Sequence, residues 1–128
     1  MNDLASWNVI VIDDEPDNSG VVEYVFRFFD VPVRVANSGT AGLTMIREER
    51  PNIVLLDIQM PKISGWDVLK MIREDTSLRG VFVIAMTAHV MDGDRERAIR
   101  AGFDGYLPKP VSPIKLIDDI RAMMQAEV

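Results

Sequence analysis

Short apolar runs rich in β-branched residues recur along this chain. They lie at 9–12, 33–36, 53–56 and 81–86, with a weaker fifth run at 106–107. Most of these runs are continuous rather than alternating, which is typical of strands that are buried on both faces of a parallel sheet. The second run alternates as Val33-Arg34-Val35, so we expect it to form an edge strand.

Helical periodicity and capping residues fill the segments between the first runs. Pro16 suits the first position of a helix. Apolar residues then recur at intervals of three and four, at Val21, Val22, Val25, Phe26 and Phe29. Ser38 is expected to cap a second helix that buries Leu43 and Ile46 and ends before Pro51. Both segments therefore predict amphipathic helices packed on the sheet.

Three more helices are predicted further along. Ser64 and Asp67 form a capping box at the start of the third helix. A fourth helix is expected over 92–101, with Gly102 at its end. Ser112-Pro113 is expected to open the fifth helix. Its apolar face consists of Leu116, Ile117, Ile120, Met123 and Met124.

Strand followed by helix, five times over, is the pattern of an open α/β domain with a parallel sheet and right-handed crossovers. Helices are then expected on both faces of the sheet. In such folds, ligands bind beyond the carboxyl ends of the strands. The residues that directly follow each apolar run are therefore the first candidates for a functional site.

Composition narrows the classes of function. The chain has 128 residues, 48% of them hydrophobic and 27% charged, so we predict one globular domain over residues 1–128. The absence of cysteine excludes disulfides, thiolate nucleophiles and Cys-based zinc sites. The net charge of −6 argues against direct binding of nucleic acid. Because there is neither a signal peptide nor an apolar run long enough to span a bilayer, we expect a cytoplasmic protein with no membrane contact.

Chemically active side chains follow four of the five runs. Asp13 and Asp14 follow the first run, Asp57 the third, Thr87 the fourth, and Lys109 lies just beyond the fifth. Taken singly, an aspartate after a strand is a turn former or a helix cap, and a lysine there is a solvated surface charge. That interpretation does not explain why groups suited to one site occur at four strand ends. We therefore expect these side chains to converge at one edge of the sheet.

Three clustered carboxylates repel one another unless a cation joins them. With no cysteine and one histidine in the chain, the fitting cation prefers oxygen ligands, as Mg²⁺ does. A carboxylate beside Mg²⁺ can attack phosphorus and form an aspartyl phosphate. Lys109 would neutralise phosphoryl oxygens, and Thr87 would donate a hydrogen bond to another. The residues alone therefore predict Mg²⁺-dependent phosphoryl chemistry.

Four segments resemble the signature segments of one protein family. They are VIVIDDEP at 9–16, VLLDIQMP at 54–61, IAMTA at 84–88 and GYLPKP at 105–110. Their order and spacing resemble the receiver domain of two-component response regulators from about Trp7 to Met124. Each segment is weak evidence alone, whereas the four together are highly specific. The resemblance implies a flavodoxin-like (βα)5 fold, a three-layer sandwich around a five-stranded parallel sheet of order 2-1-3-4-5.

The resemblance also implies the phosphoacceptor and the metal ligands. Asp57 matches the phosphoacceptor of the family. Asp14 matches the acidic residue that binds Mg²⁺ directly, and Asp13 matches its partner, which often acts through water. The backbone carbonyl of Gln59 completes the implied ligands of Mg²⁺, for which Mn²⁺ can substitute.

Switching residues are implied as well. Thr87 and Lys109 match the pair that grips the phosphoryl group, and Tyr106 matches the aromatic residue that changes rotamer on phosphorylation. Thr87 is expected to pull the loop 88–91 inward, and Ala88 leaves the site open. The Lys109–Pro110 peptide bond is expected to be cis.

Three neighbouring residues carry less weight. His89 stands two residues after Thr87 and is expected to be a loop residue rather than a phosphoacceptor. Trp66 is expected to be a partly exposed aromatic residue, with a place beside a partner site as the alternative. Gly65 fits a turn after the Asp57 loop and a flexible helix start equally well.

The resemblance implies a phosphorylation switch rather than a metabolic enzyme. A sensor histidine kinase or a histidine phosphotransfer protein donates its phosphoryl group to Asp57, and the chain catalyses only its own phosphorylation and dephosphorylation. An output partner is expected on the face formed by the fourth helix, fifth strand and fifth helix. The chain is expected to be a monomer or a phosphorylation-dependent dimer. It is expected to be a stand-alone regulator, a phosphorelay shuttle or a receiver cut from a longer protein.

Two alternatives fit part of the same pattern. A small Mg²⁺-dependent phosphatase or phosphotransferase would also use an aspartyl-phosphate intermediate. Such enzymes typically place a second acidic residue two positions after the nucleophile, where this chain has Gln59. The other alternative is a signalling-dead module of the same fold, and the presence of Asp14, Asp57, Thr87 and Lys109 argues against it.

Overall fold

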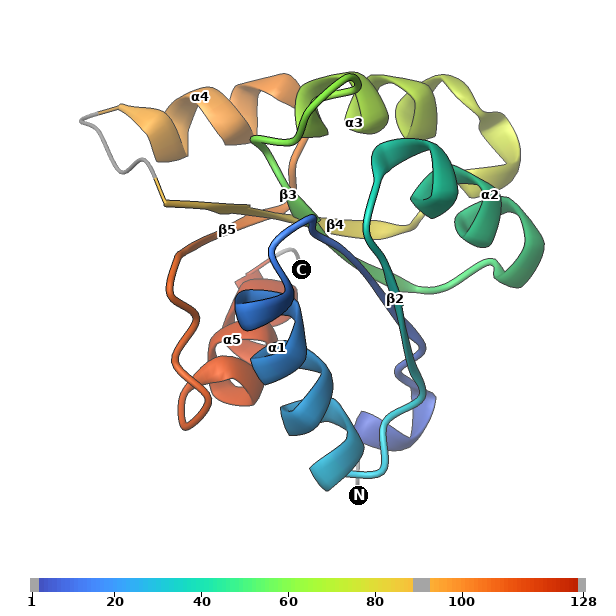
Figure 1. The fold of residues 1–128 in the computed structure, drawn as a ribbon. Helices are drawn as coiled ribbons and strands as arrows, with labels where there is room; N and C mark the ends of the chain where they lie inside the picture. The colour runs from blue at the N-terminus through green and yellow to red at the C-terminus, as the bar shows by residue number, and fades with distance from the viewer. Residues whose placement is uncertain (1–2, 89–92, 127–128) are drawn as a thin grey trace.

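A five-stranded parallel sheet forms the middle of the computed structural model, which describes residues 3–88 and 93–126 (Figure 1). Its strand order is β2-β1-β3-β4-β5. The strands are β1 (Val9–Ile12), β2 (Val33–Ala36), β3 (Ile53–Asp57), β4 (Phe82–Thr87) and β5 (Gly105–Pro108). This order confirms the predicted topology 2-1-3-4-5, and β2 is an edge strand as its alternation indicated.

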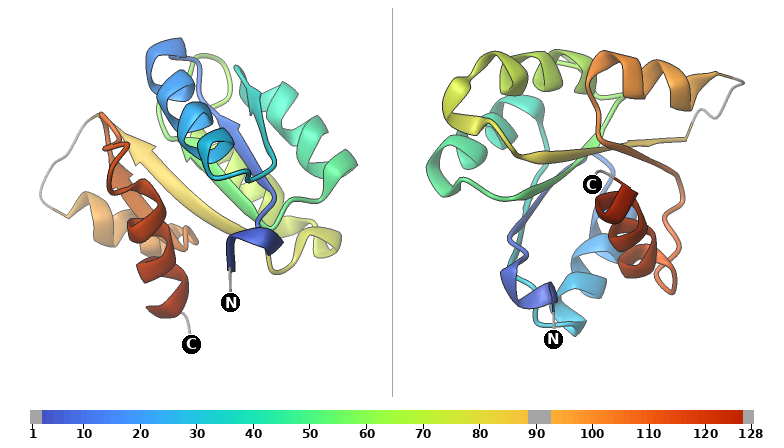
Figure 2. Two further views of the ribbon diagram at one scale, coloured as in Figure 1. Left: turned by 90° about the horizontal axis from the view of Figure 1, so that it is seen from below. Right: turned by 180° about the vertical axis from the view of Figure 1, so that it is seen from behind.

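Helices cover both faces of the sheet and complete three layers (Figures 1 and 2). The helices α1 (Pro16–Phe28) and α5 (Leu116–Ala126) lie on one face. The other face is covered by α2 (Gly39–Glu49), α3 (Gly65–Glu74) and α4 (Asp94–Ala101). Two short 3₁₀ helices, η1 (Asp3–Ser6) and η2 (Thr76–Leu78), precede β1 and β4. The predicted α/β sandwich is therefore confirmed.

The core is divided by the sheet into two apolar clusters. Val9 and Val11 of β1 belong to the cluster under α1 and α5, whereas Ile10 and Ile12 belong to the cluster under α2, α3 and α4. All four side chains are buried. Because both faces are covered, a strand gains from an apolar residue at every position, at roughly 1.5–3 kcal/mol for each side chain of this size. This explains the continuous apolar runs.

The predicted helix caps are present. The Ser38 hydroxyl accepts a hydrogen bond from the backbone N–H of Ala41 at 3.2 Å. Ser64 and Asp67 form a reciprocal capping box at the start of α3. Gly102 follows α4 with a φ of +116°, a left-handed conformation that glycine adopts without strain. These local signals were sufficient to place one end of each of these helices.

Two helices depart from the predicted pattern. In α1, Val21 is 39% exposed because it lies about 100° around the helix from Val22. Phe29 is 43% exposed because it follows the last residue of the helix. The helix α5 begins at Leu116 rather than at Ser112-Pro113. Residues 113–115 form an exposed turn, and Leu116 is the first of this segment to reach the core.

The strands β1 and β2 match the predicted runs at 9–12 and 33–36, whereas β3, β4, β5 and the start of α4 differ from the prediction by one or two residues. The strands β3 and β4 extend to Asp57 and Thr87, so these residues end their strands rather than follow them. The helix α4 begins at Asp94, and the predicted start at Asp92 lies outside the described residues. None of the helices within residues 3–88 and 93–126 combines the length and apolar character needed to cross a membrane.

Candidate functional site

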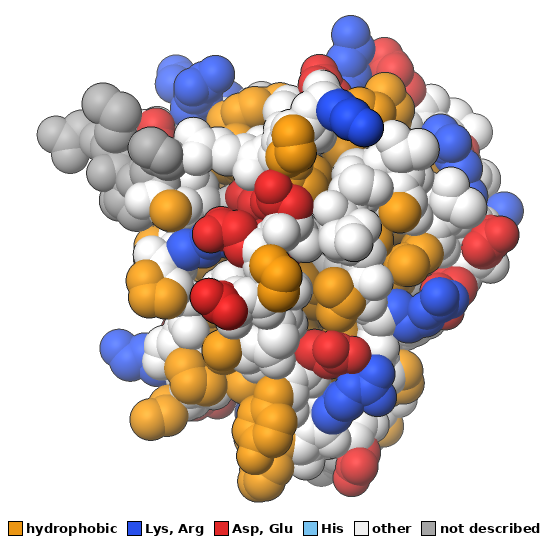
Figure 3. Space-filling view, viewed as in Figure 1, with side chains coloured by type: hydrophobic (Ala, Val, Ile, Leu, Met, Phe, Trp, Pro, Cys, Tyr) orange, Lys and Arg blue, Asp and Glu red, His pale blue; other side chains and the backbone are white. Residues whose placement is uncertain are grey.

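Three aspartate side chains meet where β1 and β3 end. Asp13 and Asp14 directly follow β1, and Asp57 is the last residue of β3. One carboxylate oxygen from each lies within 4.8 Å of the others. Asp13 and Asp57 are 1% and 2% exposed, whereas Asp14 is more exposed. Figure 3 shows acidic side chains near the middle of the face on which these strands end. The predicted convergence of Asp13, Asp14 and Asp57 is therefore observed.

Asp57 is held by one hydrogen bond and one ion pair. Its Oδ1 accepts a hydrogen bond from the backbone N–H of Gln59 at 3.1 Å. Its Oδ2 lies 3.1 Å from Lys109 Nζ, but it accepts no hydrogen bond with acceptable geometry from the residues that the structure describes. Burial raises the pKa of Asp57 to about 7; the Lys109 contact opposes this rise and the charge of Asp13 adds to it. The Asp57 carboxylate is therefore buried, charged at high pH and only partly satisfied.

Lys109 lies among three carboxylates. It follows β5, and its peptide bond to Pro110 is cis. Its side chain is 6% exposed, with Nζ at 3.2 Å from Asp13 Oδ1, 2.6 Å from Glu15 Oε1 and 3.1 Å from Asp57 Oδ2. Burial disfavours the charged ammonium, but its contacts with Glu15 and Asp57 and the charge of Asp13 outweigh burial and raise the pKa of Lys109 above its usual value. Lys109 therefore remains protonated.

Asp13 is positioned by two residues that the sequence did not single out as site residues. The backbone N–H of Glu15 donates to Asp13 Oδ1 at 2.9 Å, and Asn18 Nδ2 donates to Asp13 Oδ2 at 2.7 Å. Asn18 Oδ1 also accepts from the N–H of Val111 at 3.5 Å, which links α1 to the segment after β5. Pro16 marks the start of α1 in the sequence, and side chains in the first turn of a helix point back toward its N-terminus. Together these two facts indicate that Asn18 can reach Asp13.

Thr87 ends β4 and is 3% exposed beside this cluster. Its backbone carbonyl accepts a hydrogen bond from the N–H of Lys109 at 2.8 Å, so β4 and β5 are tied together at the site. Ala88 is exposed. His89 and Met91, which complete the predicted switch loop, lie outside the described residues.

Tyr106 of β5 is half-buried and packs against the cluster under α2, α3 and α4. Its hydroxyl is buried and makes no hydrogen bond within the described part of the chain. This burial, with a smaller contribution from Asp94, raises the pKa of Tyr106. The side chain also lines a groove of about 580 Å³ between α4, β5 and α5, together with Ile99 and Met123.

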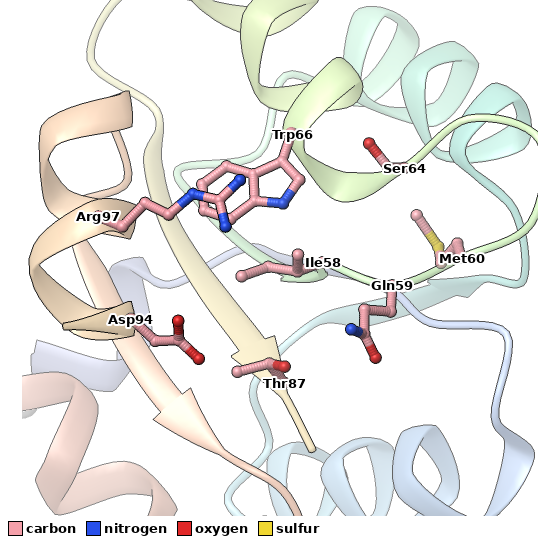
Figure 4. A pocket seen from close by; sticks show the side chains of 8 residues that line it. All are labelled: Ile58, Gln59, Met60, Ser64, Trp66, Thr87, Asp94 and Arg97. Carbon is pink, nitrogen blue, oxygen red and sulfur yellow. The ribbon is translucent and has the colours of Figure 1, made fainter. Parts of the chain in front are cut away.

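A cavity of about 400 Å³ opens beside the acidic cluster, between the start of α3 and α4 (Figure 4). Gln59 and Thr87 line one side of the cavity, and Trp66 and Arg97 line the other. The Arg97 guanidinium lies 4.7 Å from the centre of the Trp66 ring, and Trp66 makes an edge contact with Phe103 at 5.5 Å. The half-buried Trp66 therefore joins α3 to α4 next to the site.

Gly65 lets the start of α3 approach β3. A Cβ atom at this position would overlap the carbonyl oxygen of Asp57 and lie 2.6 Å from Ile58 Cα. The Gly65 N–H donates to the carbonyl of Ile58 at 2.8 Å. Close backbone approach, rather than helix flexibility, is therefore the reason for this glycine.

The donor set of the cluster fits a magnesium ion. It consists of carboxylate oxygens, and Asp57 Oδ2 has an unused acceptor position within it. Hard divalent cations prefer such ligands, and they also offset the two causes that raise the pKa of Asp57, which are burial and, to a smaller extent, the charge of Asp13. The main chain of Gln59 lies beside Asp57 through its N–H, while metal binding by its carbonyl stays a prediction.

Comparison with known proteins places this site in a family. The sequence profile described as "Response regulator receiver domain" matches residues 9–121. The chain belongs to this family. The polar-differentiation response regulator DivK of Brucella anthropi is 32% identical over 117 residues, which cover 91% of this chain and 95% of DivK. A 14.6 kDa protein of Leptolyngbya boryana is also 32% identical over 117 residues, which cover 91% of this chain and 89% of that protein.

Solved structures support the same fold. The chemotaxis protein CheY4 of Vibrio cholerae superposes with a TM-score of 0.84 at 20% identity, covering 91% of this chain and 98% of CheY4. The receiver domain of AraT from Geobacillus stearothermophilus superposes with a TM-score of 0.79 at 25% identity, covering 94% of this chain and 95% of the AraT domain. The predicted receiver family is therefore confirmed. Receiver domains act in two-component signalling, generally bind Mg²⁺, and interact with histidine kinases or phosphotransfer proteins and with output partners.

Proposed function

We propose that this chain accepts a phosphoryl group on the carboxylate of Asp57, donated by the phosphohistidine of a sensor histidine kinase or a histidine phosphotransfer protein. The observation that carries the proposal is the state of Asp57 itself. The carboxylate is 2% exposed, one of its oxygens accepts no hydrogen bond within residues 3–88 and 93–126, and Lys109 Nζ lies 3.1 Å away. A buried carboxylate with an unused hydrogen-bond acceptor lowers the stability of the fold, and such costly groups cluster at functional sites. This cost supports a role for Asp57 as the phosphoryl acceptor.

The transfer is a displacement at phosphorus. An Asp57 oxygen attacks the phosphorus, the P–N bond to the imidazole breaks, and the departing nitrogen keeps the electron pair and takes a proton from solvent. Lys109 neutralises phosphoryl oxygens from its fixed position between Asp13 and Asp57. Thr87 at the end of β4 donates its hydroxyl hydrogen to another phosphoryl oxygen.

The metal is assigned to the acidic cluster. Asp13, Asp14, Asp57 and the carbonyl of Gln59 would hold Mg²⁺, with Mn²⁺ able to take its place. When bound, Mg²⁺ supplies positive charge between the carboxylates and the phosphoryl oxygens. The chain then needs no other cofactor. Residues 1–128 act as one receiver domain that catalyses only its own phosphorylation and dephosphorylation.

The signal leaves through the groove between α4, β5 and α5. Movement of Thr87 and Ala88 toward the phosphoryl group would make room for the ring of Tyr106, which lines this groove with Ile99 and Met123. An output partner, or a second copy of the chain in a phosphorylation-dependent dimer, would bind the altered surface. A ligand can shift such an equilibrium only by the difference between its affinities for the two states.

The proposal is tested by phosphorylation with a small acyl phosphate and Mg²⁺, followed by intact-protein mass spectrometry. The wild type should gain one phosphoryl group, and chelation of Mg²⁺ should abolish the gain. Asp57→Asn should gain none while its circular dichroism spectrum stays unchanged, because the amide keeps the shape of the carboxylate but is a poor nucleophile. An adduct of the same size on folded Asp57→Asn would move the acceptor to another residue.

A further inference from the structure

Glu15 lies at the rim of the acidic cluster. It directly follows Asp13-Asp14 and precedes Pro16, the first residue of α1. Its backbone N–H donates to Asp13 Oδ1 at 2.9 Å, and its carboxylate Oε1 lies 2.6 Å from Lys109 Nζ. This is the shortest of the three carboxylate contacts of Lys109. The backbone bond places Glu15 so that its side chain can reach Lys109 across 94 residues of sequence.

The three partners of Lys109 differ in how tightly the structure holds them. An ammonium group has three N–H donors, and Asp13, Glu15 and Asp57 surround it. Asp13 and Asp57 are buried and form part of the cluster that fits a metal ion. Glu15 is 60% exposed at its side chain, and no ion pair within the described residues joins it to another cation. Glu15 is therefore the partner that can leave Lys109 for water at the lowest cost.

We propose that Glu15 is a positioning residue that holds the Lys109 ammonium in the unphosphorylated protein and competes with the phosphoryl group for it. This inference rests on the proposed function, because it takes Lys109 as the residue that binds phosphoryl oxygens. A phosphoryl group on Asp57 brings oxygens that are strong acceptors into the space around Lys109. Lys109 turns a donor toward them, and the Glu15 carboxylate moves into solvent.

The surroundings of Glu15 allow this movement. Glu15 and Lys109 line an open hollow of about 300 Å³ together with Val21, Ala88 and Pro110. The hollow adjoins the acidic cluster, so the carboxylate has room to turn away without displacing a core residue. Competition of this kind lowers the affinity of the site for a phosphoryl group while leaving the three aspartates in place.

Two substitutions separate the position of the Glu15 carboxylate from its charge. Glu15→Gln keeps the length of the side chain and removes the charge. Glu15→Asp keeps the charge and shortens the side chain by one methylene, so the contact with Lys109 is lost. Asp17→Asn is the matched control, because Asp17 is an exposed acid in the first turn of α1 and takes part in no ion pair within the described residues. It removes the same charge two residues away.

The measurement is the dissociation constant of beryllofluoride, a phosphoryl mimic, at saturating Mg²⁺, followed through the amide resonances of Gln59 and Thr87. Relative to the wild type, Glu15→Gln should bind beryllofluoride about threefold to tenfold more tightly, since one charge-assisted contact no longer competes. Glu15→Asp should shift in the same direction by a smaller factor. Asp17→Asn should stay within about twofold of the wild type. The Kd of Mg²⁺ without beryllofluoride should change by less than about twofold in all three variants.

The outcomes distinguish this inference from the proposed function. Unchanged or weaker beryllofluoride binding by Glu15→Gln, with normal binding by the wild type, overturns the competition by Glu15 and leaves the function of Asp57 intact. An equal gain in Asp17→Asn also overturns it, since general charge repulsion would then explain the effect. Absence of beryllofluoride binding in the wild type overturns the proposed function. Urea-unfolding curves of the variants at saturating Mg²⁺ serve as the folding control, because a fully folded population in buffer shows that the variants differ in binding and not in folding.

Discussion

Asp57 combines burial, like charge and incomplete hydrogen bonding in one side chain. Lys109 is the only cation in contact with it among the described residues, and Lys109 is shared with Asp13 and Glu15. The excess of negative charge destabilises the metal-free fold, and the same excess attracts a divalent cation. At the scale of single residues, stability and function therefore oppose each other.

The stability of the metal-free protein should depend on the protonation of Asp57. Its pKa is about 7 in the folded protein and near 3.8 in the unfolded chain, so the folded state binds the proton more tightly. The contribution of Asp57 protonation to the free energy of unfolding is fully present below about pH 4 and is lost as the pH rises through about 7. In EDTA, the free energy of unfolding of the wild type should fall by roughly 1–3 kcal/mol more than that of Asp57→Asn when the pH is raised from 5 to 8. Urea unfolding of both proteins at these two pH values measures the difference, and parallel pH dependences would contradict the raised pKa.

Asp14 should also cost stability in the absence of a metal. Asp14→Ala removes one of three mutually repelling carboxylates, so the melting temperature in EDTA should rise by about 3–5 °C, which corresponds to about 1 kcal/mol for a domain of this size. Excess Mg²⁺ should raise the melting temperature of the wild type but not of Asp14→Ala. Differential scanning calorimetry with and without Mg²⁺ tests both statements. An equal response of the two proteins to Mg²⁺ would place the metal elsewhere.

At the scale of elements, the start of α3 forms one wall of the site. Its capping box at Ser64 and its close approach at Gly65 bring it against the main chain of Asp57 and Ile58. Further along α3, Arg73 donates hydrogen bonds to the carbonyls of Val81 and Gly102. The helix is therefore tied to the start of β4 and to the end of α4, and it acts as a rigid support for the cluster.

Gly65→Ala should disturb the site more than the loss of the helix cap does. The added Cβ overlaps the carbonyl of Asp57, so α3 must move away from β3. This movement should lower the free energy of unfolding by about 1–3 kcal/mol and weaken Mg²⁺ binding several-fold. Ser64→Ala is the control and should cost about 1 kcal/mol with Mg²⁺ affinity unchanged, since it removes only the cap. Urea unfolding and Mg²⁺ titration of both variants provide the comparison. Equal loss of Mg²⁺ affinity in both variants would contradict the steric explanation.

At the scale of the whole molecule, the sheet connects the acidic cluster to the groove between α4, β5 and α5, which we propose as the surface for an output partner. Thr87 ends β4 at the acidic cluster, and its carbonyl holds the main chain of Lys109 just beyond β5. Tyr106 lies on β5 and lines the groove with α4 and α5. A change at Thr87 is therefore adjacent to both the phosphoryl site and the groove, without a long chain of intermediates.

Thr87→Ala should separate phosphorylation from signalling. The variant keeps Asp57, Lys109 and the acidic cluster, so it should still take up a phosphoryl group from a small acyl phosphate with Mg²⁺. It lacks the hydroxyl that would link the phosphoryl group to β4. Because one charge-assisted hydrogen bond contributes roughly 1.5–3 kcal/mol, its loss should reduce the amide shift changes that beryllofluoride causes over residues 93–110 by at least about half. Two-dimensional NMR of wild type and variant is the measurement. Full shift changes in the variant would refute this route of signalling.

Much of the fold could be predicted from sequence because its signals are local. The continuous apolar runs, the caps at Ser38 and Ser64 and the glycine after α4 each depend on residues close together in the chain, and all were found in the structure. The site could be approached for a related reason. Once the strands are parallel, their carboxyl ends share one edge, so Asp13, Asp57, Thr87 and Lys109 had to lie near one another.

What the sequence determined by itself was therefore the order of elements, the sheet, the family and the set of side chains that meet at the carboxyl edge of the sheet. Only the tertiary structure decided the partners of those residues: Glu15 on Lys109, Asn18 on Asp13, and Arg97 over Trp66. It also decided that Val21 and Phe29 are exposed and that α5 begins at Leu116. The physical reason is the same in each case. A hydrogen bond, an ion pair or burial depends on which side chains the packing of distant segments brings within a few ångströms, and no local pattern contains that distance.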